Sequence, residues 1–215
     1  MIPAMAQITT GVRSILSNPR VYDGFQRAVG SHRERDEFVN SYIRPEPGLR
    51  VLDVGCGPGR MTTWLPQVDY TGIDLSESYI EAARETYGDR GRFFVGKADE
   101  IPADELGTFD VVIAKGLLHH IDEHEILELF STTRRLLNPG GRLVTLDGTF
   151  TDDMPKLSRW VVSKDRGQSV LTPDQYRALA ERYYGSVRIG VYHKLLNIPY
   201  SHALMELSEP LLDAA

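Results

Sequence analysis

Cysteine is almost missing from this 215-residue chain, in which Cys56 stands alone. A single cysteine cannot form an intrachain disulfide, and it cannot hold an iron–sulfur cluster that needs three thiolates. Long apolar runs are missing too, and the first residues do not combine a basic start with an apolar stretch. Neither a membrane span nor a secretory leader is therefore predicted, and we expect a cytoplasmic protein.

Positive charge is in deficit, because the chain has 24 Lys and Arg but 30 Asp and Glu, which gives a net charge of −6. Without a basic field the surface does not attract phosphate backbones or anionic lipid, so we expect neither nucleic acid nor a membrane as partner. The remaining composition, 41% hydrophobic and 25% charged, is that of a globular protein. The length suits one domain with a continuous core.

The most informative stretch is residues 51–60, VLDVGCGPGR. An apolar strand ends there in a turn with Gly55, Gly57 and Gly59, where the backbone can bend sharply and approach a ligand without a Cβ in the way. Asp74 ends a second apolar run nineteen residues after Gly55. An acidic residue at about that distance usually accepts hydrogen bonds from both hydroxyls of an adenosine ribose. Together the two features predict a nucleoside site.

The same residues indicate which nucleoside binds. The dinucleotide fingerprint needs a third glycine at position 60, where this chain has Arg60, and Asp53 at the mouth suits a ligand with an ammonium group. Residues 51–59 closely resemble the first motif of the class I S-adenosylmethionine-dependent methyltransferase family. A tight turn without a ligand and a nicotinamide-dependent oxidoreductase are the alternatives, and Arg60 argues against the second.

An alternation of strands and helices follows this motif, which predicts a parallel sheet covered on both faces. The last two apolar runs are separated by seven residues, too few for a crossover helix, so they are predicted to be antiparallel neighbours. The predicted strands are 50–54, 69–74, 92–96, 109–114, 142–147, 186–192 and 200–207.

Capping patterns predict the helices. Asn18 and Pro19 open one that runs to Gly30, and Ser31 with Glu34 opens a second that ends before Arg44. Two later helices have their start signals at Asp122 with Glu125 and at Thr172 with Gln175, and they are predicted to end at 138–141 and at Gly185.

The resemblance covers about residues 45 to 207 and implies a Rossmann-like, doubly wound, mostly parallel sheet of seven strands with a reversed last strand. We expect a single α/β domain over 1–215. Its parts are an N-terminal helical cap (1–45), a cofactor-binding half (46–148), a short lid after strand five (149–171) and a C-terminal helix with a strand pair (172–208).

The resemblance also implies a cofactor, S-adenosyl-L-methionine, with S-adenosyl-L-homocysteine as product. Asp74 is expected to hold the ribose, Asp99 the adenine amino group and the 53–59 loop the methionine part. The full set of expected cofactor-binding residues is Asp53, Gly55, Cys56, Gly57, Gly59, Asp74, Leu75, Ala98, Asp99, Glu100 and Lys115.

Catalysis is expected at residues 115–121, KGLLHHI, because ligands bind at the carboxyl ends of parallel strands. The phrase Leu-His-His-Ile is frequent at this place among small-molecule methyltransferases of the family. A sulfonium is already activated, but an alcohol or phenol must also lose its proton, which an imidazole can accept near neutral pH. His119 and His120 are the candidate bases, and at most one is expected to act. A local packing or capping role is the alternative for each.

No metal site is predicted. His120 and His124 are four residues apart without an evident third ligand, and Glu128 stands where the zinc-protease pattern has its second histidine. A metal-dependent catechol-type site would need a carboxylate cluster, yet Lys115 lies where Asp147 would need an acidic partner. The lone cysteine also excludes radical use of S-adenosylmethionine.

The acceptor is expected to be a small molecule, methylated on oxygen slightly more readily than on nitrogen or carbon. The Asn/Asp-Pro-Pro-Tyr motif of amino-methyltransferases that act on macromolecules is missing, and the segment after strand five is short. A protein that binds S-adenosylmethionine without methyl transfer is the alternative, and a monomer or homodimer is expected. The candidate acceptor-pocket residues are Tyr22, Trp160, Tyr192 and His193.

Overall fold

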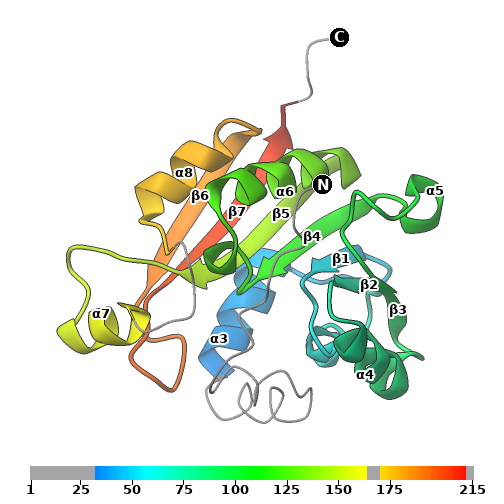
Figure 1. Ribbon diagram of the computed structural model, residues 1–215, viewed down its shortest axis with the longest axis horizontal. Coiled ribbons are helices and arrows are strands. Elements are labelled where there is room, and N and C mark those ends of the chain that lie inside the picture. Colours follow the sequence, from blue (N-terminus) through cyan, green and yellow to red (C-terminus); the bar gives the residue numbers. More distant parts are fainter. Residues whose placement is uncertain (1–31, 164–169, 212–215) are drawn as a thin grey trace, which may run out of the picture.

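A seven-stranded sheet in the order β3-β2-β1-β4-β5-β7-β6 runs through the computed structural model (Figure 1). The structure describes residues 32–163 and 170–211. All strands are parallel except β7, which is antiparallel to both β5 and β6. The Rossmann-like sheet with a reversed last strand is therefore confirmed. The strands are β1 Arg50–Val54, β2 Asp69–Asp74, β3 Gly91–Val95, β4 Phe109–Lys115, β5 Leu137–Gly148, β6 Tyr184–Tyr192 and β7 His202–Pro210.

Helices cover both faces of this sheet, as the alternating pattern predicts. The capping boxes at Asp122 and Thr172 are formed, each with its glutamate or glutamine three residues on. The α-helices are α3 His32–Asp36, α4 Glu77–Tyr87, α5 Ala103–Leu106, α6 Glu123–Leu136, α7 Lys156–Ser163 and α8 Pro173–Ala180. The other helical segments are the π-helix η1 Glu37–Ile43 and the 3₁₀ turns η2 Arg60–Thr63 and η3 Leu118–His120.

Some predicted boundaries are wrong. The break expected at 138–141 falls inside β5, because the chain passes from α6 into the strand at Leu137, where the pairing with β4 is irregular. The helix expected to end at Gly185 ends at Ala180, since the strand begins at Tyr184. Tyr184 is buried, and its hydroxyl lies 2.9 Å from that of Thr133. The helix expected at 18–30 and the cap at Ser31 lie outside the described residues.

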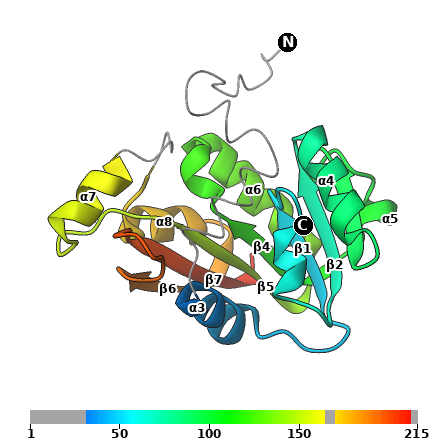
Figure 2. The same cartoon turned by 90° about the horizontal axis from the view of Figure 1, so that it is seen from below.

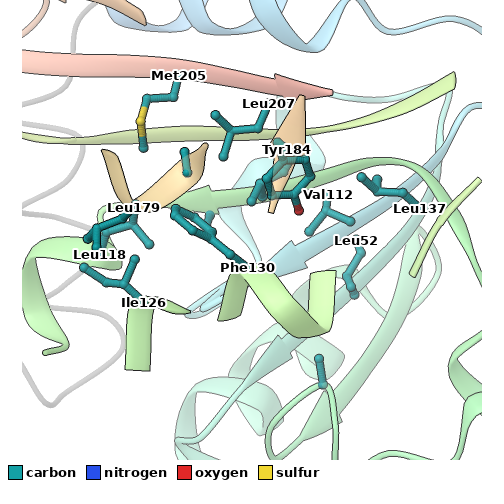
Figure 3. Close-up of a cluster of buried hydrophobic side chains, with 14 of the residues drawn as sticks. Leu52, Val112, Leu118, Ile126, Phe130, Leu137, Leu179, Tyr184, Met205 and Leu207 are labelled. Atoms are coloured by element: carbon teal, nitrogen blue, oxygen red, sulfur yellow. The ribbon is translucent and has the colours of Figure 1, made fainter. Parts of the chain in front are cut away.

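Alternating side chains of the strands divide the interior into two cores. Leu52 of β1 and Val112 of β4 face α6 and α8, where they pack with Ile126, Phe130 and Leu179 (Figure 3). The neighbouring Val51, Val111 and Ile113 face the other side, where they pack with Phe38 and Tyr42 of η1. Figure 2 shows α3 and η1 on this second face. The face on which a strand residue lies therefore decides which helix it meets.

The 149–171 segment contains α7, attached by a small third core of Met154, Val162 and Tyr200. Leu157 and Trp160 on this helix are 59% and 60% exposed. Within 32–163 and 170–211, no helix combines the length and apolar character needed to cross a bilayer.

Candidate functional site

The glycine turn after β1 is bent back onto the end of β2. Gly55, Gly57 and Gly59 have φ angles of 74°, 55° and 78°, in the left-handed region that favours glycine. The backbone N–H groups of Gly55 and Cys56 donate to the Ile73 carbonyl at 2.8 and 3.0 Å. A Cβ on Gly59 would lie only 3.0 Å from the Phe93 ring. The turn thus has the tight backbone that the glycine spacing predicts.

Asp74 is fixed at the end of β2 by two backbone donors. The Gly57 N–H reaches Oδ2 at 2.9 Å, and the Ser76 N–H reaches Oδ1 at 2.8 Å. Burial raises the pKa of Asp74, while these hydrogen bonds lower it. A carboxylate oxygen accepts more than one hydrogen bond, so both oxygens retain lone pairs for further donors. Beside it, Leu75 leaves an apolar side chain 50% exposed.

The candidate adenine residues follow β3, the neighbour of β2 in the sheet. Ala98 is buried, and Asp99 and Glu100 are exposed. The Glu100 carboxylate turns back and accepts from the Lys97 N–H at 3.1 Å. Of the two acidic residues, Glu100 thus makes a local hydrogen bond at the end of β3, and the adenine role expected of Asp99 stays a prediction.

Asp53 is a buried carboxyl group beneath the glycine turn, only 3% exposed. The Tyr70 hydroxyl donates to its Oδ2 at 2.6 Å. Burial raises its pKa to about 7, although the Tyr70 hydrogen bond and the positive charge of Lys115 act in the opposite direction. A carboxyl group with this pKa loses its proton readily when a cation approaches, because the opposite charge favours the carboxylate form.

Lys115, at the end of β4, lies between Asp53 and α3. Its Nζ lies 2.8 Å from Oε1 of Glu34 in α3 and 5.5 Å from the ring centroid of Trp64. Glu34, expected to be a helix-start residue, is only 2% exposed and turned into the site. The sequence analysis did not predict either Tyr70 or Glu34 as a site residue.

At the ends of β4 and β5 the structure joins His119 to Asp147. The His119 Nδ1 lies 2.9 Å from Asp147 Oδ1, and the His119 backbone N–H donates to the same oxygen at 3.4 Å. Both residues are buried. Asp147 Oδ2 is also buried and has no hydrogen-bond partner among residues 32–163 and 170–211. His120 is exposed, with its ring 4.0 Å from that of His119.

Asp147 entered the sequence argument only as a metal-ligand candidate. It is the penultimate residue of β5, and β4 and β5 are parallel neighbours in which Lys115 pairs with Leu146. The rule that parallel strands present their carboxyl ends together could have placed Asp147 beside His119.

The acceptor-pocket candidates lie in separate local arrangements. Trp160 is exposed on α7. The Tyr192 hydroxyl donates to Glu37 at 2.8 Å, on the η1 face. His193 Nδ1 lies 2.8 Å from Ser201 Oγ, and its Nε2 lies 3.6 Å from Asp153. Tyr22 lies outside the described residues.

Within the described part of the chain, no three His, Cys, Asp or Glu side chains are grouped so that they could hold a metal ion. His124, weighed above as a ligand, instead lies 3.6 Å from Glu128 on the surface of α6.

Comparison with known proteins shows what this arrangement resembles. Residues 51–141 match the family model described as a methyltransferase domain. An O-methyltransferase of Pyrenophora dematioidea is 30% identical over 170 residues, which cover 70% of this chain and 62% of that protein. The highly reducing polyketide synthase ltbA of Aspergillus luteorubrus is 30% identical over 190 residues, 75% of this chain and 6% of the synthase. The chain thus spans less than two thirds of the length of these relatives.

Among solved structures, the magnesium protoporphyrin IX methyltransferase of Synechocystis PCC 6803 with bound SAH has a TM-score of 0.66 at 22% identity. The match covers 92% of this chain and 98% of that one, and it shows the shared fold. Residues 51–141 thus match a methyltransferase domain in sequence, and the chain shares the fold of a solved methyltransferase.

Proposed function

We propose that the protein transfers a methyl group from S-adenosylmethionine to an oxygen atom of a small-molecule acceptor. The observation that carries this proposal is the buried pair of His119 and Asp147 at the carboxyl ends of β4 and β5. S-adenosylmethionine supplies an electrophilic methyl group, so the protein must chiefly align the acceptor and remove its proton.

On the donor side, the proposed roles follow from the contacts. Asp74 accepts the ribose hydroxyls through the lone pairs that its two backbone donors leave. Leu75 gives the base an apolar surface, and Asp99 accepts from the adenine amino group. The glycine turn with Asp53 holds the amino-acid end. Cys56, Ala98, Glu100 and Lys115 complete the donor site.

On the acceptor side, Asp147 orients His119 as the base. A carboxylate accepts the proton that Nδ1 carries, and this tautomer leaves the lone pair on Nε2 to take a proton from the acceptor. The imidazolium then formed is stabilised by the same carboxylate, as in other His–carboxylate pairs. The exposed His120 lies beside this base. Trp160 on α7 and His193 after β6 stay candidates for acceptor contacts.

A base of this kind supports oxygen as the methylated atom, because an alcohol or phenol is a poor nucleophile until it loses its proton. The Pyrenophora relative is named an O-methyltransferase, which agrees with this choice. The small acceptor is supported by the short 149–171 segment and by the absence of the Asn/Asp-Pro-Pro-Tyr motif.

The test is release of S-adenosylhomocysteine from S-adenosylmethionine with a panel of phenols, hydroxy acids, amines and β-dicarbonyl carbon acids, the products being identified by mass spectrometry. Asp147→Asn keeps the shape of the side chain but loses its charge. We expect it to lower turnover by about 10²- to 10⁴-fold while donor affinity stays within about twofold. Unchanged turnover in this variant would exclude the pair as the base. Donor binding without turnover on any acceptor would indicate a binding protein.

A further inference from the structure

A series of neighbouring buried charged groups extends from α3 to the start of the glycine turn. Glu34 of α3 contacts Lys115 of β4 at 2.8 Å, and the Lys115 charge acts on Asp53 of β1. Tyr70 ends the series with its hydrogen bond to Asp53. Glu34 and Asp53 are 2% and 3% exposed, and the Lys115 side chain is 17% exposed. These groups therefore interact with little screening by water.

The sheet explains why these residues meet. Asp53 pairs in register with Ile113, so Lys115 lies two residues beyond the partner of Asp53, where β1 enters the glycine turn. Because side chains alternate along a strand, Asp53 and Lys115 share the face of Val51 and Ile113. That face is the one covered by η1 and α3. The side chain of Glu34 thus connects α3 with the end of β4.

Among the described residues, this series contains the carboxyl groups of Glu34 and Asp53 and the ammonium group of Lys115. Burial raises the pKa of Asp53, and the negative charge of Asp74 adds to the effect, while Lys115 and Tyr70 only partly offset it. Cys56 lies in the same region with its own pKa raised by burial. A ligand that places an ammonium group at Asp53 and a carboxylate near Lys115 would complete the alternation of charge. The amino-acid end of S-adenosylmethionine carries both groups.

Within residues 32–163 and 170–211, Glu34 is the carboxylate that contacts the Lys115 ammonium group. A buried ammonium needs a carboxylate partner. If Glu34 were neutral, Lys115 would be drawn to Asp53 and would compete there with the ammonium of the donor. We propose that Glu34 is a positioning residue of the donor site, which holds Lys115 away from Asp53 and so makes α3 a wall around the amino-acid end of the cofactor. This inference rests on the proposed function, because it requires the donor to bind at the glycine turn.

The test compares ligands with and without the amino-acid end. Calorimetric titration of the full chain with S-adenosylhomocysteine and with 5′-methylthioadenosine separates the two parts of the site. We expect Glu34→Gln to weaken binding of S-adenosylhomocysteine by about tenfold, the cost of one competing buried ion pair, and to leave 5′-methylthioadenosine within about twofold. Asp36→Asn, which changes an exposed carboxylate of the same helix, is the matched control and should change neither ligand.

A double-variant cycle shows whether Glu34 acts through Lys115. In a Lys115→Gln background, Glu34→Gln should cause no further loss of S-adenosylhomocysteine affinity. If Glu34→Gln alone does not fold, the double variant, which buries neither charge, is compared with Lys115→Gln, and the two must bind S-adenosylhomocysteine equally. Equal weakening of both ligands, or no weakening of either, would overturn the inference. If the wild-type protein binds neither ligand, or if Asp74→Ala leaves both unaffected, the proposed donor site itself fails.

Discussion

The two ends of the site are built in different ways. At the donor end, Gly57 and Ser76 hold Asp74 with backbone N–H groups, and the contacts join residues at most 17 positions apart. At the acceptor end, His119 and Asp147 are 28 positions apart and are joined mainly through their side chains. Backbone donors survive most substitutions, whereas a side-chain pair is lost with either partner. We therefore expect substitutions to affect donor binding gradually and turnover abruptly.

The largest effect that would sharpen this contrast is expected at His119. His119→Gln removes the base and should lower turnover by about 10²- to 10⁴-fold, while donor affinity by titration stays near that of the wild type. His120→Ala provides the comparison and should cost no more than about threefold, because Asp147 orients His119 and His120 is exposed. The reverse ranking of the two variants would move the base to His120.

An intermediate effect is expected at Asp74. Asp74→Ala removes the acceptor of the ribose hydroxyls and also leaves the Gly57 and Ser76 N–H groups without it. Donor affinity should fall about ten- to a hundredfold, or about 1.5–3 kcal/mol, as calorimetry would measure. Asp99→Ala should weaken binding less, since Asp99 is exposed. Near-normal donor affinity in Asp74→Ala would show that Asp74 does not hold the ribose of the donor.

The smallest effect concerns stability and the pH at which it changes. The pKa of Asp53 rises on folding from 3.8 to about 7, so between these values the unfolded chain releases a proton that the folded protein retains. This contribution to stability is complete below the lower value and is lost as pH rises through the higher one. Asp53→Asn, which can still accept from Tyr70, should therefore gain on the order of 2 kcal/mol over wild type between about pH 4 and about pH 8.

Urea unfolding at both pH values measures that difference directly. A difference between variant and wild type that does not change with pH would mean that Asp53 is already ionised in the folded protein. The donor end would then contain a permanent buried carboxylate, as the acceptor end does in the proposed mechanism.

The tight turn after β1 could be predicted from the sequence because its contacts are local. Glycine spacing determines the turn, and the distance from Gly55 to Asp74 reflects the turn, one short helical segment and one strand. The bounds of β1 and β2 were predicted correctly for the same reason. The pairs at Asp147 and Glu34 depend on the register between strands and on how α3 packs, and neither leaves a periodic signal. Glu34 even has the pattern of a capping residue, although its side chain points into the site.

The C-terminal end of η1, the helix that follows α3, is held against the sheet. η1 ends at Ile43, where Arg142 of β5 donates to the carbonyls of Tyr42 and Ile43, and where Arg44 turns in a left-handed conformation. Arg188 also covers the Tyr42 ring at 4.4 Å. Between this end and α3, Phe38 is buried in the second core and Glu37 accepts a hydrogen bond from Tyr192. Glu34 is therefore presented to Lys115 by a helical segment that is held along its length.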